Sequence, residues 1–156
     1  MIELPMKAFC LMGRAGEDKI ELIIDEIFGF PEETSFEGGY DFRGTLTIHA
    51  GSYKVRSKHY FSSTGILCNL YASLVKCYDS LEGMAKYARM YEKNFEFELK
   101  MTKAGHAIIN GEYTEYLHLL NVLTFEIETD QTCVRYAIND LKQVVDLFGD
   151  NKGKHT

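Results

Sequence analysis

Apolar and polar residues alternate with a period of two in several short segments of this chain. Residues 95–101 and 122–129 both place apolar side chains at every second position. This period is typical of a strand that buries one side and exposes the other to water. We therefore expect the glutamates between the apolar positions to share one exposed sheet face; they are Glu96, Glu98, Glu126 and Glu128.

Earlier segments also have strand patterns. Residues 2–12 and 20–28 are predicted strands, and Pro5 favours a sheet edge for the first. Residues 40–50 and 53–61 flank Gly51-Ser52, which suits a two-residue type II′ turn of a hairpin. That turn would pair Ala50 with Tyr53, Ile48 with Val55 and Phe42 with Phe61. It would place His59 on the buried side as a core histidine, and a basic set on the other face: Arg43, His49, Lys54, Arg56 and Lys58.

Two segments keep the helical period. The first spans about residues 64–82, with Ser63 or Thr64 as its N-cap and Gly83 as its C-cap. The second spans about residues 130–148, with Asp130 as its cap and Gly149 as its stop.

The remaining strands are predicted from short loops and alternation. A weak strand at 84–91 would pair with 95–101 so that Tyr91 faces Phe95 and Tyr87 faces Leu99. A strand at 107–116 would then lie between 95–101 and 122–129. Its register would set Glu96 opposite Glu112, and Asn110 between Glu98 and Glu126.

Together these elements predict an α+β domain. Because every strand connection is short, we expect one antiparallel sheet of about six or seven strands, built from hairpins, with both helices packed on one side. The chain has 156 residues, so we expect a single domain at 1–149 and a disordered tail at 150–156. Neither a signal peptide nor a membrane span is predicted, and the expected location is the cytoplasm.

The net charge of −6 argues against general nucleic-acid binding, which requires a basic surface, but is compatible with a basic protein partner. Four cysteines are present without metal-ligand spacing, and they are interpreted as small hydrophobic residues in a reducing compartment. An acidic sheet face is either an ordinary solvated surface or one shaped for a cationic partner.

No catalytic motif is found in the sequence, and no catalytic residue, cofactor or metal ligand is predicted. Paired glutamates could act as acid and base in a hydrolase, or hold a hard cation, if they lay in a concave site. Our candidate partner-binding residues are Glu96, Glu98, Glu112, Glu126 and Glu128 on the sheet, followed by Glu32, Glu33 and Glu37 in an acidic loop.

Three segments, taken in order, carry a resemblance to a known family. The first segment, residues 36–46 (FEGGYDFRGTL), resembles the segment before a long hairpin. The second, residues 103–113 (KAGHAIINGEY), resembles a turn with the strand that follows it. The third, residues 125–132 (FEIETDQT), resembles a final strand that enters a helix. The chain thereby resembles the WapI-type bacterial immunity proteins from about residue 20 to residue 149. It departs from their pattern at Cys133-Val134, where such proteins usually carry an aromatic residue.

The resemblance implies a non-enzymatic antidote that binds and neutralises the toxin domain of a polymorphic, contact-delivered toxin, often a nuclease. The quoted motifs imply turns, a cap and a strand core, and they transfer no toxin-binding residue. A basic toxin domain is therefore the expected partner. The alternative function is a small-ligand-binding domain with a pocket between the helices and the sheet.

Overall fold

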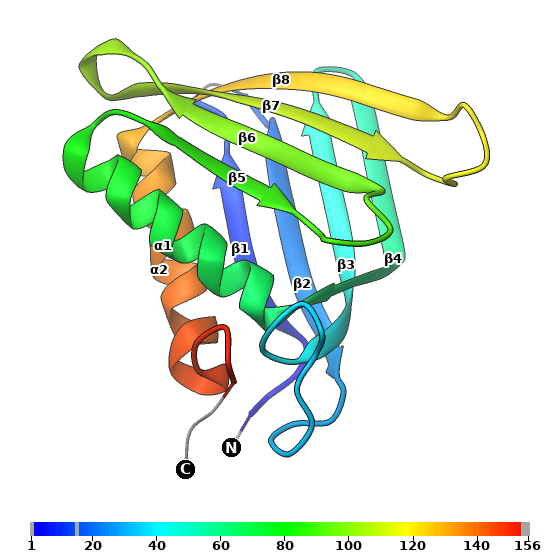
Figure 1. The fold of residues 1–156 in the computed structure, drawn as a ribbon. Helices are drawn as coiled ribbons and strands as arrows, with labels where there is room; N and C mark the ends of the chain where they lie inside the picture. Colours follow the sequence, from blue (N-terminus) through cyan, green and yellow to red (C-terminus); the bar gives the residue numbers. More distant parts are fainter. Residues whose placement is uncertain (1, 15, 154–156) are drawn as a thin grey trace.

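The computed structural model describes residues 2–14 and 16–153 of the chain. It has the predicted α+β class, with eight antiparallel strands and two helices in the described residues (Figure 1). The first sheet, sheet A, has the order β1 (Met6–Met12), β2 (Lys19–Ile27), β3 (Asp41–Ala50) and β4 (Tyr53–Ser63). The second, sheet B, has the order β5 (Met84–Ala88), β6 (Phe95–Met101), β7 (His106–Thr114) and β8 (Val122–Asp130).

The strands form two sheets of four rather than the single sheet of six or seven that we predicted. In Figure 1 the strands of sheet B cross in front of those of sheet A. A helix interrupts the chain after β4, so β5 starts a new meander instead of continuing the first one. Two amphipathic sheets bury both apolar faces when they pack against each other, which edge-to-edge pairing would not achieve.

The helices occupy one open side between the sheets instead of covering one sheet. Helix α1 (Thr64–Ser80) packs beside β5, helix α2 (Gln131–Phe148) packs beside β1, and the two helices contact each other (Figure 1). The Cys10 backbone N–H on edge strand β1 donates to Asp140 Oδ2 on α2 at 3.3 Å. Helix α2 therefore covers an edge that would otherwise be open to pairing with another chain.

Aromatic side chains fill the space between the sheets. The Phe9 ring on β1 lies 6.3 Å from Tyr87 on β5 and 6.1 Å from Phe97 on β6, measured between ring centroids. Tyr87 stacks on Phe97 at 5.5 Å, and Tyr60 meets Phe95 edge-on at 6.0 Å. The apolar side of each sheet is thus packed against the apolar side of the other sheet.

The β3–β4 hairpin starts in the predicted register and then departs from it. Ala50 faces Tyr53 and Ile48 faces Val55, with Gly51 at φ 62° in the turn. Between Gly44 and Leu46 the register shifts, because β4 carries one extra residue there, so Phe42 faces Ser62 instead of Phe61. A bulge of this kind exchanges the two faces of the strand that follows it.

This bulge overturns the predicted position of His59. His59 and Phe61 are exposed, whereas Tyr60 and Ser62 are buried. The two side chains that point inward end in hydroxyl groups, and both hydroxyls form hydrogen bonds with a third buried hydroxyl. The hydroxyls of Tyr60 and Ser62 each lie 2.8 Å from the Tyr87 hydroxyl.

Sheet B keeps the predicted register except at its first strand. Glu96 faces Glu112, and Asn110 faces both Glu98 and Glu126. Strand β5 ends at Ala88, and Tyr87 faces Phe97 rather than Leu99. The loop from β5 to β6 is longer than we predicted, and Tyr91 lies exposed within it.

Both helix N-caps act as predicted. Ser63 Oγ accepts the Ile66 N–H, and Asp130 Oδ1 accepts the Cys133 N–H. Gly149 ends α2, whereas α1 ends at Leu81, which adopts a left-handed conformation at φ 55° in place of the predicted cap Gly83.

Residues 150–153 of the predicted tail form a turn whose Asn151 carbonyl accepts the Gly39 N–H at 2.9 Å. Residues 154–156 of that tail lie outside the described residues. Neither α1 nor α2 has the length and apolar character that crossing a bilayer demands.

All four cysteines are free thiols, with Cys77 buried and the others partly buried. Burial raises the pKa of each thiol. A raised pKa keeps a thiol protonated and unreactive. The interpretation of these residues as small hydrophobic side chains fits this environment.

Candidate functional site

The outer face of sheet B gathers the predicted glutamates. In β6, β7 and β8 the odd-numbered residues point into the core and are buried, apart from the partly buried Leu123, so the even-numbered ones point outward. We call this surface the acidic face, and define it by Glu96, Glu98, Glu112, Glu126 and Glu128. Glu96 and Glu98 are half-buried and the other three are exposed.

The negative charge of the acidic face is only partly balanced. Within the described residues, only Glu128 among its five carboxylates forms an ion pair, a 3.8 Å contact with Arg14 between two exposed side chains. Lys86 faces Glu98 across the β5–β6 pair without coming within ion-pair distance. Glu96 and Glu112, directly opposite each other, repel.

The centre of the acidic face is a shallow hollow and not a deep cleft. Its volume is about 190 Å³, and it is lined mainly by Lys86, Glu96, Glu98, Asn110, Glu112 and Thr124. Ligand-binding sites usually measure about 300 to 1,000 Å³. No group of three or more His, Cys, Asp or Glu side chains in the described part of the chain is arranged to hold a metal ion. The glutamate pair therefore lines a hollow that is smaller than a usual ligand-binding site.

The second predicted acidic region is divided by the structure. Glu32 and Glu33 are exposed on the loop between β2 and β3. Glu37 is turned inward instead, with only 5% of its side chain exposed. Its carboxylate accepts two hydrogen bonds from Arg89, at 3.2 Å from Nε and 3.0 Å from Nη2.

Arg89 lies beside the buried hydroxyl cluster of Tyr60, Ser62 and Tyr87. Burial alone would lower the pKa of Arg89, but the hydrogen bonds and charge of Glu37 outweigh it, so the net pKa is raised. Burial also raises the pKa of Tyr87, to about 12, against the opposing effect of its hydrogen bonds with Ser62 and Tyr60. Glu37 thus neutralises an internal cation and contributes no free charge to the loop surface.

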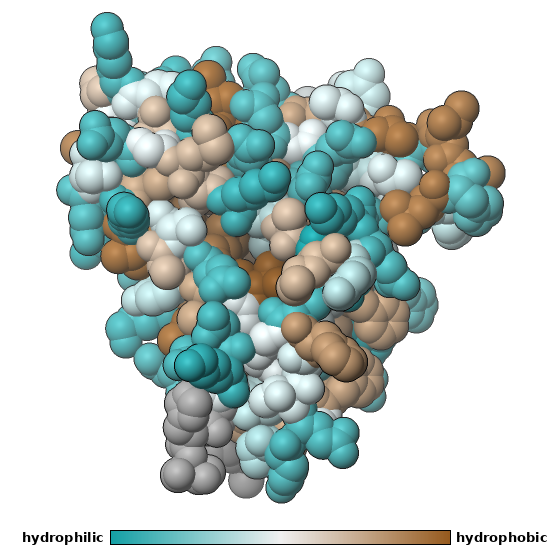
Figure 2. Space-filling view, in the orientation of Figure 1, coloured by the Kyte–Doolittle hydropathy of each residue, from teal (hydrophilic) through white to brown (hydrophobic). Residues whose placement is uncertain are grey.

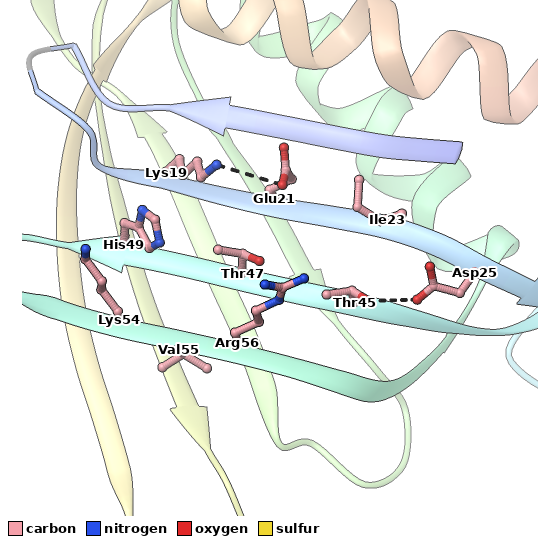
Figure 3. Close-up of a pocket in the computed structure, with 10 residues that line it drawn as sticks. All are labelled: Lys19, Glu21, Ile23, Asp25, Thr45, Thr47, His49, Lys54, Val55 and Arg56. Atoms are coloured by element: carbon pink, nitrogen blue, oxygen red, sulfur yellow. Dashed lines mark hydrogen bonds and ion pairs between the residues drawn. The ribbon is translucent and has the colours of Figure 1, made fainter. Parts of the chain in front are cut away.

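Sheet A presents a different outer face. A hollow of about 590 Å³ lies over β2, β3 and β4 (Figure 3). The predicted basic residues His49, Lys54 and Arg56 line it, as do Glu21 and Asp25 from β2. The face is therefore mixed and not purely basic.

The two carboxylates in this hollow already have partners. Lys19 Nζ lies 3.8 Å from Glu21, and Asp25 accepts the Thr45 hydroxyl at 2.7 Å (Figure 3). Arg43, also predicted for the basic face, pairs with Asp25 and Glu26 at 3.8 and 3.7 Å. Lys58 is exposed beside the bulge, where its carbonyl accepts a hydrogen bond from Arg43. The two outer faces of the protein thus differ clearly in charge.

The sequence analysis did not single out one prominent surface, the loop between β7 and β8. Large apolar side chains are exposed there, as Figure 2 shows at the upper right of the molecule. The sequence does contain a signal for this surface. Four large apolar residues lie in a segment that has neither strand alternation nor helical period: Tyr116, Leu117, Leu119 and Leu120. Apolar residues outside any element have no core face to occupy.

The chain was compared with known proteins at the levels of sequence family, curated proteins and solved structures. No curated protein and no solved structure matches it. A family model does match, over residues 10–149, which is most of the chain and includes every strand of sheet B and both helices. This chain belongs to the immunity protein WapI-like family.

Proposed function

We propose that this chain is a non-enzymatic immunity protein that neutralises a basic toxin domain by one-to-one binding through its acidic face. Membership of an immunity protein family supports toxin neutralisation in general. The observation that carries the choice of surface is the like-charged pair Glu96 and Glu112, held opposite each other with no ion-pair partner among the described residues. A cationic partner would relieve this repulsion on binding.

The toxin domain in this proposal is a nuclease that acts in the cytoplasm. A nuclease must attract phosphate, so its active surface carries Lys and Arg. An acidic antidote competes with the nucleic acid for that surface, and opposite charges accelerate the encounter. The net charge of −6 gives this chain the required sign.

Binding to the cognate toxin domain, to be sought in the genes next to this chain's own, tests the proposal. We expect a one-to-one complex whose association rate falls as salt rises, and loss of the toxin's activity when the complex forms. The triple variant Glu96→Lys, Glu112→Lys and Glu126→Lys should associate more slowly and with a weaker salt dependence.

The control carries three charge reversals elsewhere: Glu32→Lys, Glu33→Lys and Glu82→Lys. All three residues are exposed and lie outside the acidic face. Equal slowing in both triple variants would mean that net charge alone matters. Slowing in the control only would move the contact surface to the loop of Glu32 and Glu33.

A further inference from the structure

The loop joining β7 to β8 exposes more apolar surface than a water-facing loop needs. We call residues 115–121 the apolar loop. Leu120 is 97% exposed, Leu117 59% and Tyr116 53%. Figure 2 shows hydrophobic residues gathered where Figure 1 places this loop. Contiguous apolar patches on a soluble protein mark sites of interaction.

A hollow lies beside the apolar loop and extends its surface. It measures about 420 Å³ and lies between Tyr53–Val55 of β4 and Leu120–Leu123. Tyr53 is 67% exposed on the hairpin turn across from Leu120. Tyrosine is enriched at protein interfaces, and the residues that dominate binding cluster in well-packed pockets.

The apolar loop is continuous with the acidic face. Along β8 the outward positions are Val122, Thr124, Glu126 and Glu128, so one strand face changes from apolar to acidic. Glu112 on β7 faces Thr124, and Thr114 faces Val122. A partner that covers the loop therefore also overlies the carboxylates. Its surface must be apolar where it meets the loop and cationic where it meets the carboxylates.

This arrangement selects a cationic protein over a second copy of the chain. Each copy carries a net charge of −6, and symmetric contact through the loop would bring two acidic faces toward each other. The end of α2 lies at the opposite end of the molecule from the loop (Figure 1).

We propose that the apolar loop, with Tyr53, anchors the toxin domain, whereas the acidic face steers it. The proposal rests on the proposed function and divides that function between two neighbouring surfaces. The partner surface is an apolar patch bordered by Lys or Arg side chains. Desolvated apolar contacts control the lifetime of a complex, and charges at its border control the rate of encounter.

Kinetic binding measurements test this division. The probe is the same toxin domain that tests the proposed function, and the variants are Leu120→Ser and Tyr116→Ser. The matched control is Tyr136→Ser, because Tyr136 is 62% exposed on α2, which begins at the other end of β8. Each loop variant should raise the dissociation rate at least tenfold, with the association rate within twofold of the unaltered chain and its salt dependence unchanged. The control should alter neither rate.

Three outcomes would overturn the anchor. If the unaltered chain binds and the dissociation rates of both loop variants stay within twofold, the proposed function stands and the anchor is wrong. If the unaltered chain does not bind at all, the proposed function fails and the anchor fails with it. If sedimentation shows a dimer that Leu120→Ser converts to a monomer, a second copy covers the loop. Melting temperatures of the variants verify that the fold is intact, which the exposure of Leu120 leads us to expect.

Discussion

Arg89 holds Glu37 through two parallel hydrogen bonds, of 3.2 and 3.0 Å, between segments that lie 52 residues apart in the chain. Glu37 precedes β3 of sheet A, and Arg89 follows β5 of sheet B, so the pair joins the two halves of the fold. Only 13% of the Arg89 side chain and 5% of the Glu37 side chain are exposed. A bidentate pair shielded from water in this way is specific in geometry and costly to break.

Replacing Arg89 by methionine should destabilise the protein by about 3 kcal/mol, because the Glu37 carboxylate would remain buried without its cation. Denaturant unfolding measures this loss. The double variant Arg89→Met and Glu37→Gln should lose less unfolding free energy than the two single variants lose together, since it removes both charges. As a control, Lys142→Met removes the exposed pair with Asp146 and should leave stability unchanged. An Arg89 variant as stable as this control would contradict the role of the pair.

Replacing Glu112 by lysine should stabilise the free protein while it weakens binding. The new cation would face Glu96 directly and turn a repulsive cross-strand pair into an attractive one, worth about 0.5 kcal/mol. The same change should slow association with the toxin domain. Thermal unfolding and association kinetics on the one variant measure the two effects. The control is Glu82→Lys, which changes the net charge by the same amount as Glu112→Lys and should not stabilise the protein. A destabilised Glu112 variant would show that the repulsion is already relieved.

Replacing Gly65 by alanine should destabilise the protein by about 2 kcal/mol, although alanine favours helices more than glycine does. A Cβ on Gly65 would lie 2.7 Å from the Gly38 Cα and closer still to its carbonyl group. The loop before β3 crosses the start of α1 there, and the Gly65 N–H donates to the Gly38 carbonyl at 3.2 Å. Asn69→Ala on the exposed side of α1 is the control, and should be neutral or stabilising. Chemical denaturation compares them, and an equally stable Gly65 variant would show that the loop can move away.

Stability should fall as pH rises from about 10 toward 12. The pKa of Tyr87 is about 12 in the folded protein because the side chain is buried, and an unfolded tyrosine titrates near 10. Above pH 10 the unfolded chain therefore binds fewer protons, and alkali favours unfolding. A shift of this size corresponds to roughly 3 kcal/mol when complete.

The variant Tyr87→Phe should flatten this pH dependence between about pH 10 and 12, as followed by denaturant unfolding at each pH. Tyr60, whose pKa is raised by burial and then by Tyr87, retains part of the slope. The exposed residue Tyr136 provides the control, and Tyr136→Phe should keep the full slope. Equal slopes in Tyr87→Phe and the unaltered protein would place the alkaline transition elsewhere.

The sequence predicted what depends on local pattern. The period of two in residues 95–101 places Phe95 and Phe97 inside and Glu96 and Glu98 outside, which the structure confirms. The caps Ser63 and Asp130 are correct because a side-chain oxygen at a helix start needs only its own following N–H groups. The register of Glu96 with Glu112 followed from a short loop, which leaves little freedom in how the strands pair.

The prediction of which side chains of β4 are buried was wrong beyond the point where that strand carries one extra residue. The bulge in β4 moved His59 from the predicted core to the surface, and it buried Tyr60 in its place. Alternation alone could not show this, because Tyr60 and Phe61 are neighbours and both are apolar. The sequence pattern is therefore equally compatible with either of them pointing into the core. Which phase is buried depends on Tyr87 across the core, whose hydroxyl lies 2.8 Å from that of Tyr60.

The sequence by itself determined the elements of this protein, the acidic face of sheet B and the family resemblance, because alternation, caps and turns act over a few residues. Only the tertiary structure decided that the strands divide into two packed sheets, that Glu37 serves Arg89 instead of the surface, and that the apolar loop borders the acidic face. These relationships join segments far apart in the chain. They are set by which apolar surfaces exclude water from one another, and no local pattern encodes that choice.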